Sequence, residues 1–207
     1  MNLAVAAAAS GKPTIVFDLD PQGSAAGYHD RRLANGGESQ PKVASIQPVR
    51  LPHELKAAIS DGYALAIIDT PPNVSGDAVH ISQAGDLIII PVRPSAMDLD
   101  AIKSTIGIAQ QTGRPSGVVL SMCRHQGTLT DQARELIEDD FKFPVVPQTI
   151  GDRVAFVHAA TQGLSVLESE PESKAAEEIT ALWQWVESAL TEIEKEQNET
   201  SRSAANG

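Results

Sequence analysis

Short apolar runs alternate with segments of helical periodicity along most of this chain. The apolar runs predict strands at 14–19, 42–46, 64–69, 87–92, 117–122 and 143–146. The helical periodicity predicts helices near 1–10, 52–60, 76–84, 98–112, 128–139, 152–161 and 172–197. Most of the strand segments are continuously apolar, which is typical of strands that are covered on both faces. The alternation therefore predicts an α/β fold, with a doubly wound, mostly parallel sheet flanked by helices.

The same pattern predicts three parts of the chain. Residues 1–168 form one α/β domain, and residues 169–198 form an acidic helix that packs on this domain. Leu182, Trp185, Leu190 and Ile193 lie near one face of that helix and are expected to anchor it. Residues 199–207 are polar and are predicted to form a disordered tail.

Charge and composition narrow the possible partners and compartments. The net charge is −11, and the part from Glu168 onward holds ten acidic and three basic residues, a net of −7. An acidic chain is a poor general nucleic-acid binder, so DNA contact would need a local basic patch assembled by dimerisation. Arg31 and Arg32 fall in the polar segment 31–41, which predicts a solvated loop. The single cysteine, Cys123, is expected to be a packed thiol, and so few cysteines are typical of a reducing compartment. No apolar run is long enough to span a bilayer. Together these features predict a cytoplasmic protein without membrane contact.

Acidic residues follow two of the predicted strands. Asp18 and Asp20 end the first strand in "DLDPQG", and Asp69 ends the third in "IIDTPP". Ligands in open parallel sheets bind beyond the carboxyl ends of the strands, so these three carboxylates are expected to converge. Such a cluster indicates a divalent cation, because the carboxylates would otherwise repel one another or take up protons. An apolar strand that ends on Asp, as in "ALAIIDTPP", is also the Walker-B pattern for holding magnesium.

Four segments together resemble the ParA/MinD family of deviant Walker ATPases, most closely its small ParA-type (ParF-like) partition ATPases. They are "IVFDLDPQGSAAGY", "YALAIIDTPPNVS", "AGDLIIIPVRPSAMDLDA" and "VVPQTIGDRVAFVHAATQGLSVLE". The resemblance covers residues 2 to 168. It implies a P-loop NTPase-like dimer with ATP and Mg²⁺ at the interface.

The resemblance also implies roles for individual residues. Asp20 would help to place the attacking water, Asp18 would support the metal, and Asp69 would hold magnesium through water. The segment 91–98 matches one that shapes the site and the dimer interface, and 147–153 matches a loop near the adenine. The implied cofactor-binding residues are Arg93, Ser121 (where many relatives have Asn), Pro147, Gln148, Thr149 and Asp152.

The family's first strand and phosphate loop, K-G-G-x-x-K-[ST], precede the helix that matches residues 1–10, and these 207 residues do not contain that loop. The phosphate loop supplies backbone N–H groups and lysines to the phosphates and a hydroxyl to magnesium. Three explanations are open: a start placed too far downstream, a truncated and inactive chain, or a protein that binds partners without hydrolysis. Without the strand, two neighbouring strand edges would be exposed.

Three functional hypotheses follow. The first, implied by the resemblance, is a partition ATPase that dimerises with ATP, binds DNA non-specifically, associates with the nucleoid and is stimulated by a centromere-binding ParB-type adaptor. The second is a non-catalytic dimerisation or adaptor protein with the same fold. The third, a phosphorylatable receiver domain, shares the acidic pocket but requires a lysine at the end of a later strand, where this chain has residues 121–124 and Pro147.

Overall fold

The computed structural model describes residues 1–71 and 78–205. Its strands form two parallel sheets, with the order β2-β1-β3 in one and β4-β5 in the other. The strands are β1 (Thr14–Asp18), β2 (Lys42–Ser45), β3 (Leu65–Asp69), β4 (Ile88–Val92) and β5 (Ser116–Leu120). The α/β class and the parallel pairing predicted from the apolar runs are confirmed.

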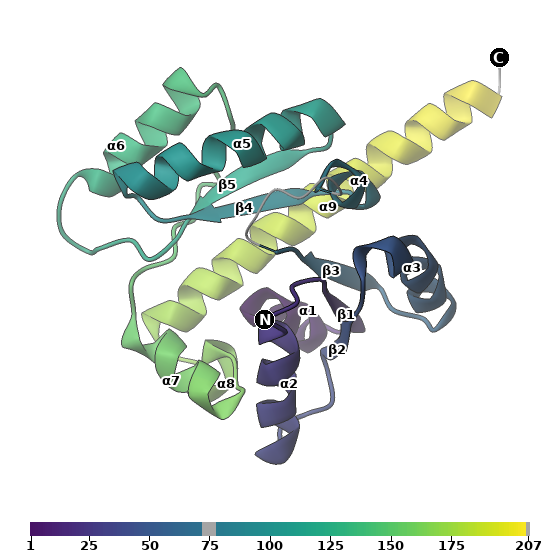
Figure 1. The fold of residues 1–207 in the computed structure, drawn as a ribbon, viewed down its shortest axis with the longest axis horizontal. Helices are drawn as coiled ribbons and strands as arrows, with labels where there is room; N and C mark the ends of the chain where they lie inside the picture. Colours follow the sequence, from purple (N-terminus) through teal and green to yellow (C-terminus); the bar gives the residue numbers. More distant parts are fainter. Residues whose placement is uncertain (72–77, 206–207) are drawn as a thin grey trace.

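Helices cover both faces of these sheets (Figure 1). The helices of the described residues are α1 (Asn2–Ala9), α2 (Ser24–Ala34), α3 (Leu51–Ser60), α4 (Ala78–Ala84), α5 (Ala96–Thr112), α6 (Leu129–Glu135), α7 (Val154–Gln162), α8 (Val166–Ser169) and α9 (Lys174–Ala205), with the short turns η1 (Pro48–Arg50) and η2 (Leu136–Asp140). Local signals set several of the ends. Ser95 caps α5 by accepting a hydrogen bond from the Asp98 amide, and Gly113 ends it in the left-handed conformation.

Alternate side chains of each strand enter different cores. In β1, Phe17 packs with α3 and α4 residues such as Leu51 and Ile81, whereas Val16 packs with Ala4 of α1 and Ala25 of α2. In the other sheet, Val118 and its neighbours pack with α5 and α6, and Val119 packs with Leu182 of α9. Each sheet is therefore the middle layer of three, as continuously apolar strands require.

The edges of β3 and β4 distinguish this structure from a single continuous sheet. Within the described residues, β3 pairs only with β1 and β4 pairs only with β5. The apolar residues of β3 are only half-buried, whereas Val16 and Phe17 of β1 are buried. One core of α1 and α9 residues also takes in Leu65 of β3 and Ile89 of β4, so the helices bridge the two sheets. Within the described residues, the expected two strand edges therefore lack a neighbouring strand.

The structure corrects several expectations about individual elements. Residues 143–146 form no named strand, and only an isolated bridge joins Val145 to Val118. Residues 31–34 belong to α2, a helix that was not predicted from the sequence. The predicted loop at 31–41 is therefore shorter in the structure. The helix α9 continues to Ala205, into the range where a disordered tail was expected. Residues 76 and 77 of the predicted helix 76–84 lie outside the described residues. No helix within the described residues is long and apolar enough to cross a membrane.

Candidate functional site

The three aspartates meet at one edge of the β2-β1-β3 sheet. Asp18 and Asp69 are direct neighbours in the parallel register of β1 and β3, at the last position of each strand. Asp20 follows two residues after Asp18, and the Leu19 amide between them donates to the backbone carbonyl of Asp69 at 2.9 Å. The structure thus brings together the residues that the strand ends predicted.

Asp18 has a structural task that the sequence did not indicate. It is 1% exposed, and its Oδ2 accepts hydrogen bonds from the amides of Ala25 (3.1 Å) and Ala26 (3.0 Å). Its Oδ1 accepts from the Asp20 amide at 3.1 Å. The N-cap position of α2 is Gly23, which has no side chain, so Asp18 caps this helix from the end of β1. Both carboxylate oxygens are already used inside the protein.

Asp20 and Asp69 are more open than Asp18. Asp20 is half-buried, and its Oδ1 accepts from the Gln22 amide at 2.9 Å, while Asp69 is exposed. Partial desolvation raises the pKa of Asp69, the nearby amino terminus opposes this, and the negative charges of Asp18 and Asp20 add to it. Among the described residues, no three His, Cys, Asp or Glu side chains form a preformed metal cluster. One or two carboxylates completed by water and phosphate oxygens are nevertheless the donor set that Mg²⁺ ordinarily uses, so Asp20 and Asp69 fit this ion.

A cavity of about 310 Å³ lies at the carboxyl ends of β4 and β5. Arg93 and Asp152, two of the expected cofactor-binding residues, both line it, and Arg93 Nε lies 3.7 Å from Asp98 Oδ2. The other lining residues are Pro94, Ser95, Met122, Arg124, Gln126, Gly127, Leu129 and Thr130. Met122 has a φ of 52°, a left-handed conformation that is uncommon for a residue with a side chain. No pattern in the sequence indicated this turn, which directs the chain from β5 around the cavity.

The remaining expected cofactor residues do not line this cavity. The Ser121 hydroxyl donates to the Val92 carbonyl at 3.3 Å, so it is engaged between β4 and β5. The Pro147 carbonyl accepts from Arg134 at 3.3 Å, and Thr149 is half-buried. Gln148 differs from these, because its Oε1 is buried and has no hydrogen-bond partner in the described part of the chain. A buried amide oxygen without a donor is rare and leaves Gln148 able to accept from a ligand.

Helix α9 holds the loop 151–153 in place. The Gly151 amide donates to Glu178 Oε2 at 3.0 Å, and Arg153 forms an ion pair with the same carboxylate. A Cβ at position 151 would lie 2.9 Å from Arg153 Nε, so glycine allows the arginine to reach Glu178. Within this loop, the Asp152 amide donates to the carbonyl of Cys123. Cys123 is buried, as expected.

Replacing Glu178 with alanine is expected to release this loop. The variant loses a charged acceptor for one amide and one guanidinium, which should lower the free energy of unfolding by about 1–3 kcal/mol. Hydrogen exchange of the Gly151 amide should accelerate more than that of core amides. Glu177→Ala, which removes the adjacent exposed glutamate of α9, is the control. Equal effects of the two variants would contradict the assignment.

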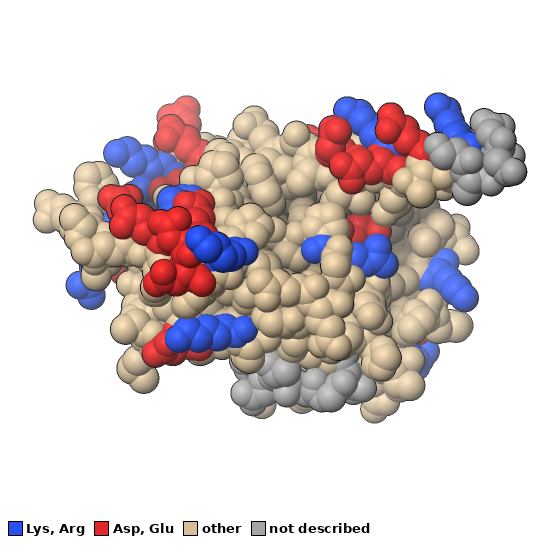
Figure 2. Space-filling model, turned by 90° about the horizontal axis from the view of Figure 1, so that it is seen from above, with Lys and Arg blue, Asp and Glu red and all other residues tan. Residues whose placement is uncertain are grey.

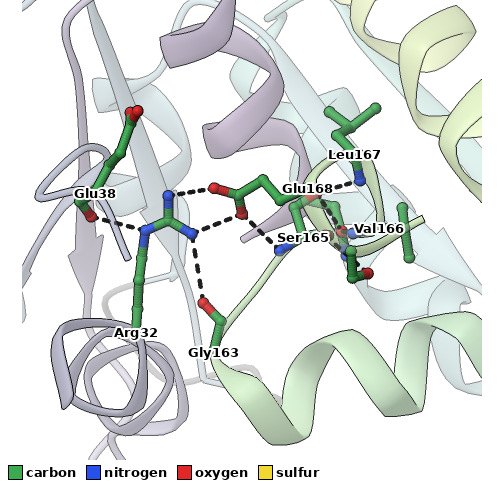
Figure 3. Close-up of polar contacts among 9 residues, drawn as sticks. Arg32, Glu38, Gly163, Ser165, Val166, Leu167 and Glu168 are labelled. Carbon is green, nitrogen blue, oxygen red and sulfur yellow. Dashed lines mark hydrogen bonds and ion pairs between the residues drawn. The ribbon is translucent and has the colours of Figure 1, made fainter. Parts of the chain in front are cut away.

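Arg32 clamps α2 to α8 (Figure 3). It is 1% exposed, and its guanidinium donates to both oxygens of Glu168 (2.7 and 2.5 Å) and to the Glu38 carbonyl (2.9 Å). Glu168 also accepts from the Ser165 amide in the capping box that begins α8. The expectation that Arg32 lies in a solvated loop is wrong, since a partner 136 positions away along the chain buries it.

The family of this three-layer α/β chain follows from a comparison with family models. The family model of the CobQ/CobB/MinD/ParA nucleotide binding domain matches residues 1–166. The chain belongs to this family.

Two relatives of this chain are named for carboxysome distribution and for chromosome partitioning. The maintenance of carboxysome distribution protein A of Gloeobacter kilaueensis is 32% identical over 172 residues, which cover 81% of this chain and 76% of the relative. The chromosome-partitioning ATPase Soj of Thermus thermophilus is 23% identical over 208 residues, covering 85% and 84%. ParA-type ATPases are thus the relatives of this chain.

Solved structures show the same fold. The cell division ATPase MinD of Pyrococcus furiosus has a TM-score of 0.68 at 19% identity and covers 90% of both chains. Apo McdA of Cyanothece has a TM-score of 0.66 at 17% identity and covers 91% of both chains. An ATP complex of a Cyanothece McdA variant, with a TM-score of 0.61 at 16% identity, covers 92% of this chain and 89% of the other. At these identities the likeness concerns the fold alone.

Proposed function

We propose that this chain is a ParA-type ATPase that binds Mg-ATP at the carboxyl edge of its sheets. The observation that carries the proposal is the adjacency of Asp18 and Asp69 in register, with Asp20 two residues beyond. Asp69 would hold magnesium, and Asp20 would orient the attacking water. Asp18 supports this site indirectly, because its carboxylate fixes the start of α2 and the loop that carries Asp20. Magnesium, when bound, neutralises charge on the phosphate oxygens.

The base of the nucleotide is proposed to lie over the ends of β4, β5 and the segment 147–153. Gln148 offers its unpaired Oε1 to an exocyclic amino group, and Arg93 and Asp152 approach from the wall of their shared cavity. Ser121, Pro147 and Thr149 flank this surface and shape it. Their hydroxyl and carbonyl groups are already engaged or half-buried, so we assign them contact with the base and no hydrogen-bonding role.

The partner proteins and DNA belong to the same proposal. The chain forms an ATP-dependent homodimer that binds DNA non-specifically, associates with the nucleoid in the cytoplasm and is stimulated by a ParB-type adaptor. On the face seen in Figure 2, Lys and Arg side chains lie among Asp and Glu and do not form a continuous basic surface. DNA contact is therefore assigned to the dimer, where basic groups from two copies can combine. Plasmids, chromosomes and other cargoes such as carboxysomes are all compatible with the relatives.

The test supplies the phosphate-binding elements ahead of Met1. A first strand and a phosphate loop of the form K-G-G-x-x-K-[ST] are fused there, and Mg-ATP binding is measured by calorimetry. We expect stoichiometric binding and a doubling of mass in light scattering on adding Mg-ATP. Asp20→Ala should keep binding but lower the hydrolysis rate by about 100-fold, because it removes the group that positions water. Asp100→Ala, an exposed carboxylate on α5, is the control.

The outcomes separate the two functions under consideration. No Mg-ATP binding by the fused protein would refute the ATPase proposal. Self-association that is the same with and without Mg-ATP would instead favour the non-catalytic adaptor, for which the acidic helix α9 provides an exposed surface. Hydrolysis that is unchanged in Asp20→Ala would refute the role given to that residue.

A further inference from the structure

Helix α7 exposes apolar side chains that its own core does not use. Val154 is 65% exposed and Val157 is 62% exposed, while Ala159 on the opposite face is buried. Two exposed valines one turn apart form an apolar stripe along the helix. Single exposed apolar residues are ordinary on a protein surface, so the significance of these two depends on the surface around them.

This stripe borders a shallow groove between α7 and α2. The groove has a volume of about 600 Å³ and is lined by Arg31, Phe156, Val157, Ala160 and Thr161. Its floor is thus apolar, and its one charged lining residue comes from α2.

Arg31 supplies an uncompensated positive charge at the rim of the groove. Its Nε donates to the Ala160 carbonyl at 3.3 Å, which fixes the guanidinium beside α7. Within residues 1–71 and 78–205, Arg31 takes part in no ion pair, unlike the neighbouring Arg32. Asp30 is adjacent on α2, but side chains one residue apart on a helix point in different directions. The remaining N–H groups of Arg31 suit a carboxylate, which guanidinium binds in a two-pronged geometry.

We propose that this groove, defined by Arg31, Phe156, Val157, Ala160 and Thr161, binds a short amphipathic acidic segment of a partner protein. Apolar side chains of the segment cover Val157 and Phe156, and an Asp or Glu of the segment pairs with Arg31. The charge of the groove selects an acidic partner over a basic one. Binding here does not require nucleotide, so it is independent of the proposed ATPase function.

The test selects peptides for the groove and then dissects their binding. A phage-displayed library of random peptides is panned on the full chain without nucleotide and counter-selected on Val157→Asp. Affinities of the selected peptides are measured by fluorescence polarisation. We expect them to combine apolar residues with Asp or Glu, and to bind Val157→Asp and Arg31→Glu at least about tenfold more weakly. Val49→Asp, at a valine that is 82% exposed on η1, should bind normally.

Exchanging the charges of Arg31 and of its partner in the peptide tests whether the two residues pair directly. Replacing the critical acidic residue of the peptide with Lys should restore binding to Arg31→Glu and weaken binding to the unmodified chain. Amide hydrogen exchange should show protection by the peptide within α7 and the adjoining turns of α2. Circular dichroism of each variant confirms that its fold is retained.

Three results would overturn the proposal. The panning could yield no peptide that discriminates against Val157→Asp, or the selected peptides could lack acidic residues and bind Arg31→Glu normally. Light scattering of the chain alone could also show a dimer that Val157→Asp dissociates, which would assign the groove to a second copy of this chain. Because every assay omits nucleotide, none of these outcomes bears on Mg-ATP binding.

Discussion

Replacing Arg32 with alanine is expected to lower the free energy of unfolding by about 3–5 kcal/mol, the range for breaking a buried ion pair from one side. The guanidinium is 1% exposed and donates to Glu168 and to the Glu38 carbonyl. Its removal leaves these acceptors without their donor and opens a cavity between α2 and α8. Urea denaturation followed by circular dichroism measures the loss.

Matched variants separate the buried pair from surface charge. Lys12→Ala removes one partner of the exposed Lys12–Glu187 pair and should cost less than about 1 kcal/mol. A double replacement of Arg32 and Glu168 by methionine and leucine should cost less than either single replacement by alanine, since no charge remains buried. An Arg32→Ala loss as small as that of Lys12→Ala would contradict the clamp.

The pair also predicts a dependence of stability on pH. Burial works to raise the pKa of Glu168, but hydrogen bonds from Arg32 and from the Ser165 amide outweigh it, so the net shift is downward. A carboxylate with a lowered pKa in the folded state contributes stability at neutral pH, and this contribution is lost as pH falls through the lowered pKa. Glu168→Gln should therefore flatten the acid limb of the stability profile.

Replacing Asp18 with alanine is expected to lower the free energy of unfolding by about 3 kcal/mol, because three backbone amides lose their acceptor. These are the amides of Asp20, Ala25 and Ala26. Asp20→Ala should cost less than about 1 kcal/mol, since its Oδ1 accepts only a local turn amide. Both values come from denaturation curves of the same protein.

Hydrogen exchange of individual amides tests the same prediction at the start of α2. In Asp18→Ala the Ala25 and Ala26 amides should exchange much faster, while amides of β5 stay protected. If Asp18→Ala were as mild as Asp20→Ala, the carboxylate would not cap α2, and a direct metal role would become the better interpretation. Asp18→Asn keeps one acceptor oxygen and should fall between the two.

The sequence predicted much of the fold from local patterns. Continuous apolar runs indicated buried parallel strands, and five of the six predicted strands are present as such. The sixth, at 143–146, contributes only an isolated bridge between Val145 and Val118. The convergence of Asp18 and Asp69 also followed from the sequence, since parallel strands bring their carboxyl ends to one edge.

Helix α2 shows where local reasoning failed. Its residues, "SAAGYHDRRLA", include an internal glycine and few apolar side chains, and its N-cap position is another glycine. Intrinsic propensity for such a helix is low. It is stabilised instead by Asp18 at its start and by Glu168 near its end, and these partners lie outside the helix, the second of them far along the chain.

The sequence by itself determined the α/β class, the position of the strands and the gathering of acidic residues at one sheet edge. These properties depend on the period of apolar residues and on strand direction, which are local. Only the tertiary structure decided that Asp18 is a helix cap and that Arg32 is a buried clamp. The clamp depends on two groups 136 positions apart that meet in the folded chain, and the cap depends on how the end of β1 lies against the first turn of α2. Neither contact follows from the intrinsic preference of a single segment.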